Sequence, residues 1–114
     1  MKLSLKERLV LLSVLPKKGN FKNLVEIRAL GEVLRITEAE RVEIDMHNDE
    51  ATGTIQWNTE KAKPKDVTIT AKGLEIIQKG LTDLDKRGEA TEDHLDVWKR
   101  FEGMKAEVVE MPKG

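Results

Sequence analysis

Acid–base or metal chemistry in this sequence would depend on its two histidines, and the first of them lies in an acidic stretch. Asp45, His47 and Asp49 alternate with other residues, so on a β-strand their side chains would share one face. Two carboxylates and an imidazole on one face could bind a metal ion or move a proton. The same pattern is typical of the solvated side of an amphipathic strand that runs into a turn, and we favour this interpretation.

The second histidine, His94, is flanked by Asp93 and Asp96. Neither carboxylate is four residues away, as it would be in an H-x-x-x-D pair on one helix face, so we interpret His94 as a surface residue. The chain has no cysteine, which excludes thiolate metal sites and cysteine nucleophiles. It also has no G-x-S-x-G motif and no glycine-rich phosphate loop. The sequence therefore predicts a non-enzymatic protein without a metal or a cofactor.

Charge is distributed unevenly along the 114 residues. Residues 1–36 hold eight Lys and Arg against three Asp and Glu, whereas residues 37–60 hold one Arg and seven acids. The acidic stretch could pair with the basic one in the same molecule, with another copy, or with a partner of opposite charge. As candidate partner-binding residues we select Glu43, Asp45, Asp49 and Glu50, which could occupy a basic groove as inhibitors that mimic nucleic acid do.

Five stretches show the apolar spacing of a helix. Their expected N-terminal caps are Ser4, Asn23, Thr37, Thr70 or Ala71, and Thr91. Pro16 is expected to end the first helix and Gly88 the fourth. Phe21 is expected to anchor the loop that follows the first helix. Gly73 and Gly80, inside the fourth helix, predict close packing of that helix against a sheet.

Between the helices the apolar residues alternate, which indicates short strands. The alternating runs are residues 42–46, 53–58 and 67–70, with a turn at 48–50, although the first run could instead extend the helix before it. They predict a small antiparallel three-stranded sheet with helices at both ends, an α+β fold that is winged-helix-like in outline. Residues 1–103 would form a single domain. Residues 104–114 would form a tail that is disordered or adds a strand through Val108, Val109 and Met111.

The two tryptophans are the largest apolar side chains of the sequence. Trp57 is expected to lie with Ile55 on the core face of its strand, and Trp98 with Leu95 and Phe101 on one stripe of the last helix. We interpret both tryptophans as core or partly buried anchors. A position at a partner interface is the alternative for one of them.

A winged-helix-like outline raises nucleic-acid binding as an alternative function. The lysines that would contact phosphates are Lys17, Lys18, Lys22, Lys61, Lys63 and Lys65. However, the segment in the position of a recognition helix carries Glu38, Glu40 and Glu43, which the DNA backbone would repel. We therefore place this alternative second.

Several segments of the chain resemble small uncharacterised proteins of phages and prophages. The likeness lies in the opening residues 3–8, in Leu15–Phe21 with its L-P-x-x-G-N-F pattern, in Thr54–Lys63 and in Thr91–His94. It extends over most of the chain up to about Phe101. The resemblance implies a phage or prophage origin and brings no activity and no functional residues with it.

Together these patterns predict a phage or prophage accessory protein that acts through protein–protein contacts, alone or as a small oligomer, and modulates or inhibits a host or phage protein. The apolar run at residues 9–15 is too short to span a membrane, and no signal-peptide cleavage pattern follows it. We therefore expect a cytoplasmic protein, in the host cytoplasm if a phage encodes it, with no membrane contact.

Overall fold

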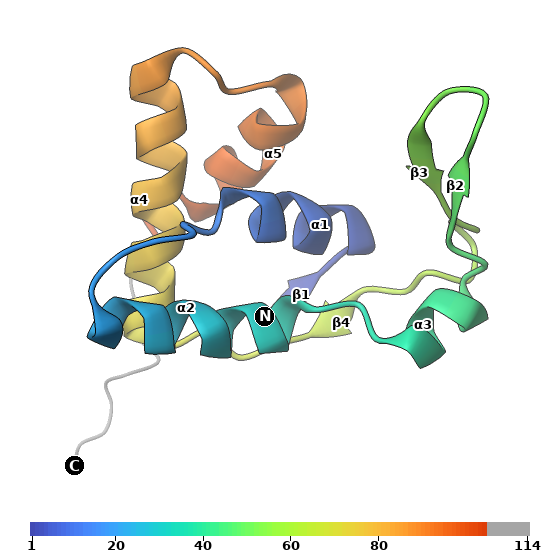
Figure 1. Ribbon diagram of the computed structural model, residues 1–114, viewed down its shortest axis with the longest axis horizontal. Coiled ribbons are helices and arrows are strands. Elements are labelled where there is room, and N and C mark those ends of the chain that lie inside the picture. Colours follow the sequence, from blue (N-terminus) through green and yellow to red (C-terminus); the bar gives the residue numbers. More distant parts are fainter. Residues whose placement is uncertain (105–114) are drawn as a thin grey trace.

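A computed structural model of the chain describes residues 1–104, which form five helices and four short strands (Figure 1). In chain order the elements are β1 (Lys2–Leu3), α1 (Leu5–Val14), α2 (Phe21–Leu34), α3 (Glu38–Glu43), β2 (His47–Asp49), β3 (Thr54–Gln56), β4 (Lys65–Asp66), α4 (Ala71–Arg87) and α5 (Glu92–Phe101). The predicted α+β fold class is confirmed. The winged-helix-like outline stays a prediction.

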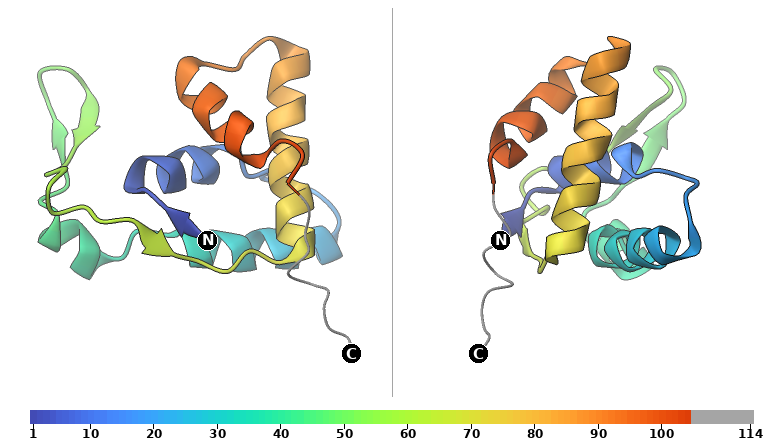
Figure 2. Two further views of the ribbon diagram at one scale, coloured as in Figure 1. Left: turned by 180° about the vertical axis from the view of Figure 1, so that it is seen from behind. Right: turned by 90° about the vertical axis from the view of Figure 1, so that its left-hand side faces the viewer.

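The core lies among four helices. Helices α1, α2, α4 and α5 pack against one another, with β1 and β4 beside them (Figures 1 and 2). The fully buried side chains at the centre include Leu3, Leu11, Leu34 and Phe101. No residue between Leu34 and Val67 belongs to this core. The middle third of the described chain therefore contributes no side chain to this core.

Four of the five predicted helix starts are confirmed. Ser4 and Glu7 form the expected capping box of α1, and the hydroxyl of Thr37 accepts the Glu40 N–H at the start of α3. Helices α4 and α5 follow Thr70 and Thr91. At the first three caps the hydroxyl accepts an N–H that has no partner inside the first helical turn. At Thr91 the backbone N–H instead donates to the side chain of His94.

The predicted start of the second helix is wrong. Asn20, three residues earlier than Asn23, caps α2, and its side chain accepts the N–H of Asn23 at 2.8 Å. Phe21 is therefore the first residue of α2 and does not anchor the loop; its side chain is 88% exposed. Asparagine is a common N-cap residue, and both Asn20 and Asn23 are of this type. The residue type alone therefore does not show which of the two begins the helix.

The predicted three-stranded sheet is wrong. The structure has two separate two-stranded antiparallel sheets, in which β1 pairs with β4 and β2 pairs with β3. Val67 and Ile69 are buried as expected, but the strand before them pairs with Lys2 and Leu3 and not with the middle of the chain. Strands β1 and β4 have only two residues each, which is too short for an alternation of apolar and polar residues to be visible in the sequence.

Residues 42–46 are not a strand either, because α3 continues to Glu43 and ends in a tight turn. The N–H of Met46 donates to the carbonyl of Arg41 at 2.9 Å, and that of Asp45 to Val42 at 3.2 Å. This is the Schellman arrangement of a helix C-terminus, with Asp45 at the left-handed position, φ +57°. The helical extension that we weighed for this run is therefore correct up to Glu43.

Gly80 of α4 marks close packing, but against a helix: a methyl group there would stand 2.8 Å from the carbonyl oxygen of Val14, at the end of α1. One on Gly73 would lie closest to Thr70 and Ile69, just before α4, at 3.2 and 3.3 Å. Gly80 thus allows the end of α1 to touch the backbone of α4.

The predicted tail, apart from Met104, lies outside the described residues.

Candidate functional site

A two-stranded ribbon projects from one end of the molecule, and it carries the acidic residues singled out in the sequence. We call residues 44–58, with β2 and β3, the arm (Figures 1 and 2). The arm strands pair with each other in the register His47 with Gln56, Asn48 with Ile55, and Asp49 with Thr54. The side chains of both strands are exposed or, at Asp49, half-buried. The outer backbone edge of each strand has no strand beside it in the described part of the chain.

The base of the arm is fixed by one buried side chain and one backbone hydrogen bond. Ile44, only 2% exposed, ends α3 and begins the arm. Its carbonyl accepts the N–H of Asn58 at 2.7 Å, which joins the two ends of the arm. The Asn58 side chain then accepts the N–H groups of Glu60 and Lys61 and turns the chain toward β4.

A buried arginine holds α3, and with it the arm, against the helical body. Arg8 of α1 is fully buried, and its guanidinium donates to both carboxylate oxygens of Glu40, at 2.6 and 3.0 Å. The same guanidinium donates to the carbonyls of Leu34 and Arg35 at the end of α2. One side chain therefore ties α1, α2 and α3 together.

This pairing sets the charge state of Glu40. The hydrogen bonds from Arg8 lower the pKa of the Glu40 carboxyl, and the charges of Arg8 and Lys65 lower it further, against an opposing effect of partial burial. Glu40 is thus held as a carboxylate. From the sequence, Glu40 is predicted only as one of three acids that would repel DNA, and Arg8 has no predicted role, because no local pattern shows that residues 8 and 40 meet.

The tip of the arm is organised by Asp49. One carboxylate oxygen accepts the N–H of Ala51 at 2.9 Å, and the other accepts the Gln56 side chain at 3.0 Å. The carbonyl of Asp49 also accepts the N–H of Gly53, which has φ +72° and closes the turn. The carboxylate that we selected as a partner contact is therefore used within the arm itself.

The other three selected acids have different settings. The side chains of Glu43, at the end of α3, and Glu50, at the turn, are exposed. Asp45 is exposed as well, but its backbone occupies the left-handed position that ends α3. Glu43 and Glu50 are thus the acids of this group whose side chains can face a partner without a part in the local fold.

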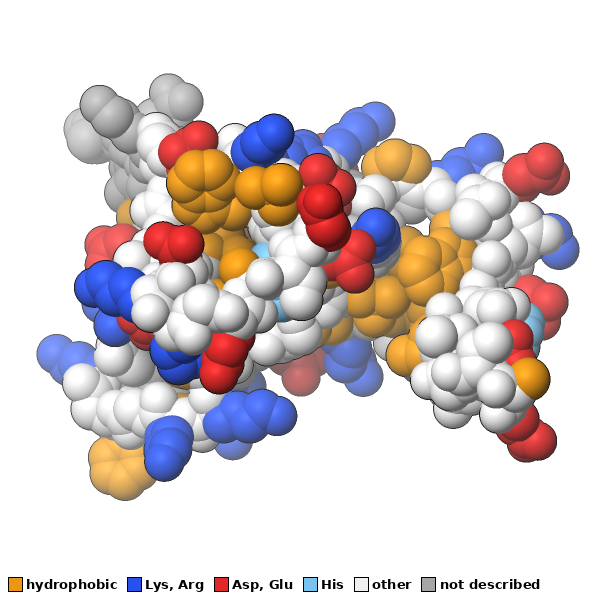
Figure 3. Space-filling view, turned by 90° about the horizontal axis from the view of Figure 1, so that it is seen from above, with side chains coloured by type: hydrophobic (Ala, Val, Ile, Leu, Met, Phe, Trp, Pro, Cys, Tyr) orange, Lys and Arg blue, Asp and Glu red, His pale blue; other side chains and the backbone are white. Residues whose placement is uncertain are grey.

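Apolar side chains lie on the arm and at its base. Ile55, which we expected on the core side of a sheet, is 48% exposed, so that prediction is wrong; Trp57 is half-buried, as expected for a partial anchor. Figure 3 shows hydrophobic side chains in the hollow between the arm and the helical body. Ile55 lost its expected burial because the arm has no third strand or helix over it.

Among residues 1–104, neither histidine side chain forms a hydrogen bond with a carboxylate. The Nδ1–H of His47 donates to the backbone carbonyl of Asp45 at 2.9 Å, and the Asp49 carboxylate is engaged elsewhere. His94 accepts the backbone N–H of Thr91 at Nδ1, 2.9 Å away, and so helps to cap α5. Among residues 1–104 no group of three potential ligands is placed to hold a metal ion.

The six lysines of the nucleic-acid alternative fall into two groups. Lys17, Lys18 and Lys22 lie in or next to the loop between α1 and α2. Lys61 and Lys63 lie between the arm and β4, and Lys65 is the first residue of β4. Helix α2, with 14 residues and a length of about 21 Å, separates the two loops (Figure 1). The structure does not gather these lysines into one basic surface.

Two further findings bear on the class of protein. No helix in residues 1–104 has the length and apolar character needed to cross a bilayer. The sequence matches no family model, and it has no match among curated proteins or solved structures.

Proposed function

We propose that this protein is a non-enzymatic accessory protein that works by protein–protein contact, with the arm as its contact element. One observation carries the proposal: no side chain of residues 35–66 belongs to the main core. A segment of this length costs conformational entropy to order, and the fold gains little buried apolar surface from it in return. Binding to a partner would explain why the protein has a segment that its own core does not need.

The chemistry of the arm favours a basic partner surface. From Val42 to Glu60 the sequence has five acids and no lysine or arginine. Exposed Ile55 adds an apolar contact beside them. A groove lined by Lys and Arg, with an apolar floor, would match both features, and opposite charges would also speed association.

The proposal includes a phage or prophage origin and the modulation or inhibition of a host or phage protein. The origin is supported by the resemblance of the Leu15–Phe21 and Thr54–Lys63 segments. The second of these segments contains β3 and the base of the arm, so the likeness includes the proposed contact element.

Charge reversal on the arm tests this function. The variant Glu43→Lys with Glu50→Lys changes two exposed acids whose side chains form no hydrogen bond with another residue between 1 and 104. The matched control is Glu32→Lys with Glu75→Lys, whose side chains are 66% and 70% exposed on α2 and α4. Tagged full-length chains would be used to capture partners from lysate of the natural host, with quantification by mass spectrometry.

We expect a captured protein that the wild-type chain and the control retain equally. The arm variant should retain about tenfold less of it. Equal retention by both double variants would refute the arm as the contact element.

A further inference from the structure

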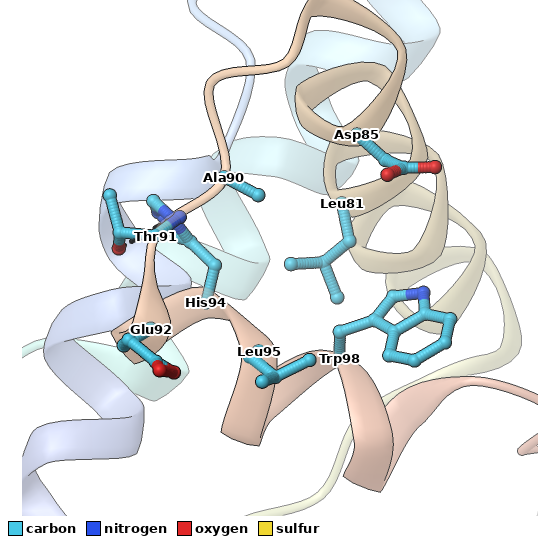
Figure 4. A pocket seen from close by; sticks show the side chains of 8 residues that line it. All are labelled: Leu81, Asp85, Ala90, Thr91, Glu92, His94, Leu95 and Trp98. Carbon is cyan, nitrogen blue, oxygen red and sulfur yellow. Dashed lines mark hydrogen bonds between the residues drawn. The ribbon is translucent and has the colours of Figure 1, made fainter.

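A second surface lies between α4 and α5, at the other end of the molecule from the arm. Two adjoining hollows of about 420 and 370 Å³ share Leu81 and Trp98 and together form a groove. Helix α4 forms one wall and α5, with the loop before it, the other (Figure 4). The size of each hollow lies within the range of known binding pockets.

Apolar side chains line this groove and are open to solvent. Leu81 of α4 is buried beneath it, while Leu95 and Trp98 of α5 are 40% and 38% exposed. We predicted one apolar stripe on α5 that includes Phe101; Phe101 is fully buried, but Leu95 and Trp98 are left at the surface. Partly exposed tryptophan in a concave site is typical of the residues that dominate binding energies.

Among residues 1–104, the carboxylates that line the groove are Asp85, Glu92 and Glu102, and neither hollow is lined by lysine or arginine. His94 also lines the first hollow. Glu92, Leu95, Trp98 and Glu102 recur at helical spacing, so acids stand at both ends of the apolar pair along α5. Figure 3 shows hydrophobic side chains at this end of the molecule, with both acidic and basic side chains next to them.

We infer that the groove between α4 and α5 is a docking site for a basic amphipathic helix of a partner protein. Apolar side chains at a spacing of three or four residues would cover Leu95 and Trp98, as in other complexes of a helix in a groove. Lysine or arginine beside them would meet Asp85, Glu92 and Glu102. This inference is independent of the arm.

The test uses a labelled synthetic peptide of leucine and lysine, with all its leucines on one helical face, and the full-length chain. In the Trp57→Phe background Trp98 is the only tryptophan, so its emission reports on the groove alone. Binding should shift the Trp98 emission to shorter wavelength and protect it from acrylamide quenching. A peptide of the same composition with scattered leucines should bind about tenfold more weakly.

The variant Asp85→Lys with Glu102→Lys should weaken peptide binding about tenfold. Both positions are at helix C-termini, where lysine interacts favourably with the helix dipole, so the fold is retained. The control Glu32→Lys with Glu75→Lys makes the same change of charge and should bind like the wild type.

Three results would overturn the inference: an unchanged Trp98 spectrum, equal binding of both peptides, or equal loss in the two charge variants. Binding only to a chain that ends at Met104 would also overturn it, since the occupant would then be residues 105–114 of the chain itself.

Discussion

Arg8 and Glu40, 32 positions apart in the chain, form a two-pronged ion pair in which the arginine is fully buried. The guanidinium also satisfies two backbone carbonyls at the end of α2. The pair is thus the main polar connection between the helical body and α3, from which the arm extends.

Replacement of Arg8 by methionine should destabilise the protein by about 3 kcal/mol, because a partly buried carboxylate and two carbonyls lose their donor. Glu40→Gln keeps an acceptor for Arg8 but leaves its fully buried guanidinium without a counter-charge, so it should cost a similar amount, about 3 kcal/mol. Urea unfolding followed by circular dichroism would measure both. A neutral effect of Arg8→Met would show that this pair does not support the fold.

Acid should destabilise the protein below pH 4.5, the ordinary pKa of glutamate. The folded state lowers the pKa of Glu40, so the unfolded state binds its proton first as the pH falls, and stability is lost through the folded pKa. Glu7 acts in the same direction: partial burial alone would raise its pKa, but hydrogen bonds from Arg100 and Ser4 lower it. Urea unfolding between pH 6 and about pH 3 should show a flatter profile for Glu40→Gln; identical profiles would exclude Glu40 as a contributor.

Asp45→Gly should stabilise the protein by about 0.5–1 kcal/mol, because glycine adopts the left-handed conformation of residue 45 without a clash of Cβ. Asp45→Val should have the opposite effect, since a β-branched side chain is strained there. Asp45→Asn removes the charge and tolerates this conformation, so it separates the effect of the charge from the effect of the backbone conformation. Thermal unfolding would rank the three variants, and a stable valine variant would contradict the geometry.

Gly80→Ala should destabilise the protein by about 1–2 kcal/mol, even though alanine favours a helix by up to about 1 kcal/mol over glycine. The new methyl group would meet the Val14 carbonyl at 2.8 Å and push α1 away from α4. Gly53→Ala, at a turn where nothing lies within 4 Å, is the comparison for conformational strain alone. Denaturant unfolding that showed a gain from Gly80→Ala would contradict the close approach of the two helices.

Local signals predicted most of the helices. Hydroxyl caps at Ser4, Thr37 and Thr70 act within one turn, so the sequence displays them directly. Thr91 precedes α5 in the same way, although the bond there runs from its backbone N–H to His94. Gly88, with φ +69° at the end of α4, is a local signal of the same kind.

The errors concern contacts between distant segments. The pairing of Leu3 with Lys65 and the burial of Arg8 depend on where the chain returns in space, and no spacing in the sequence reports that. The alternation of apolar residues at 42–46 predicts a strand, whereas α3 ends there with Asp45 in the left-handed conformation. Asp49 stays a predicted partner contact, and the sequence did not show that the turn uses both of its carboxylate oxygens.

The positions of the arm and of the groove between α4 and α5 have a consequence for stoichiometry. The molecule measures 48 Å along its longest axis, and the two surfaces lie toward opposite ends of it (Figure 1). The proposed contact on the arm and the proposed docking of a helix in the groove use no residue in common. Together the two proposals therefore predict a ternary complex, with this chain as a bridge between two different proteins.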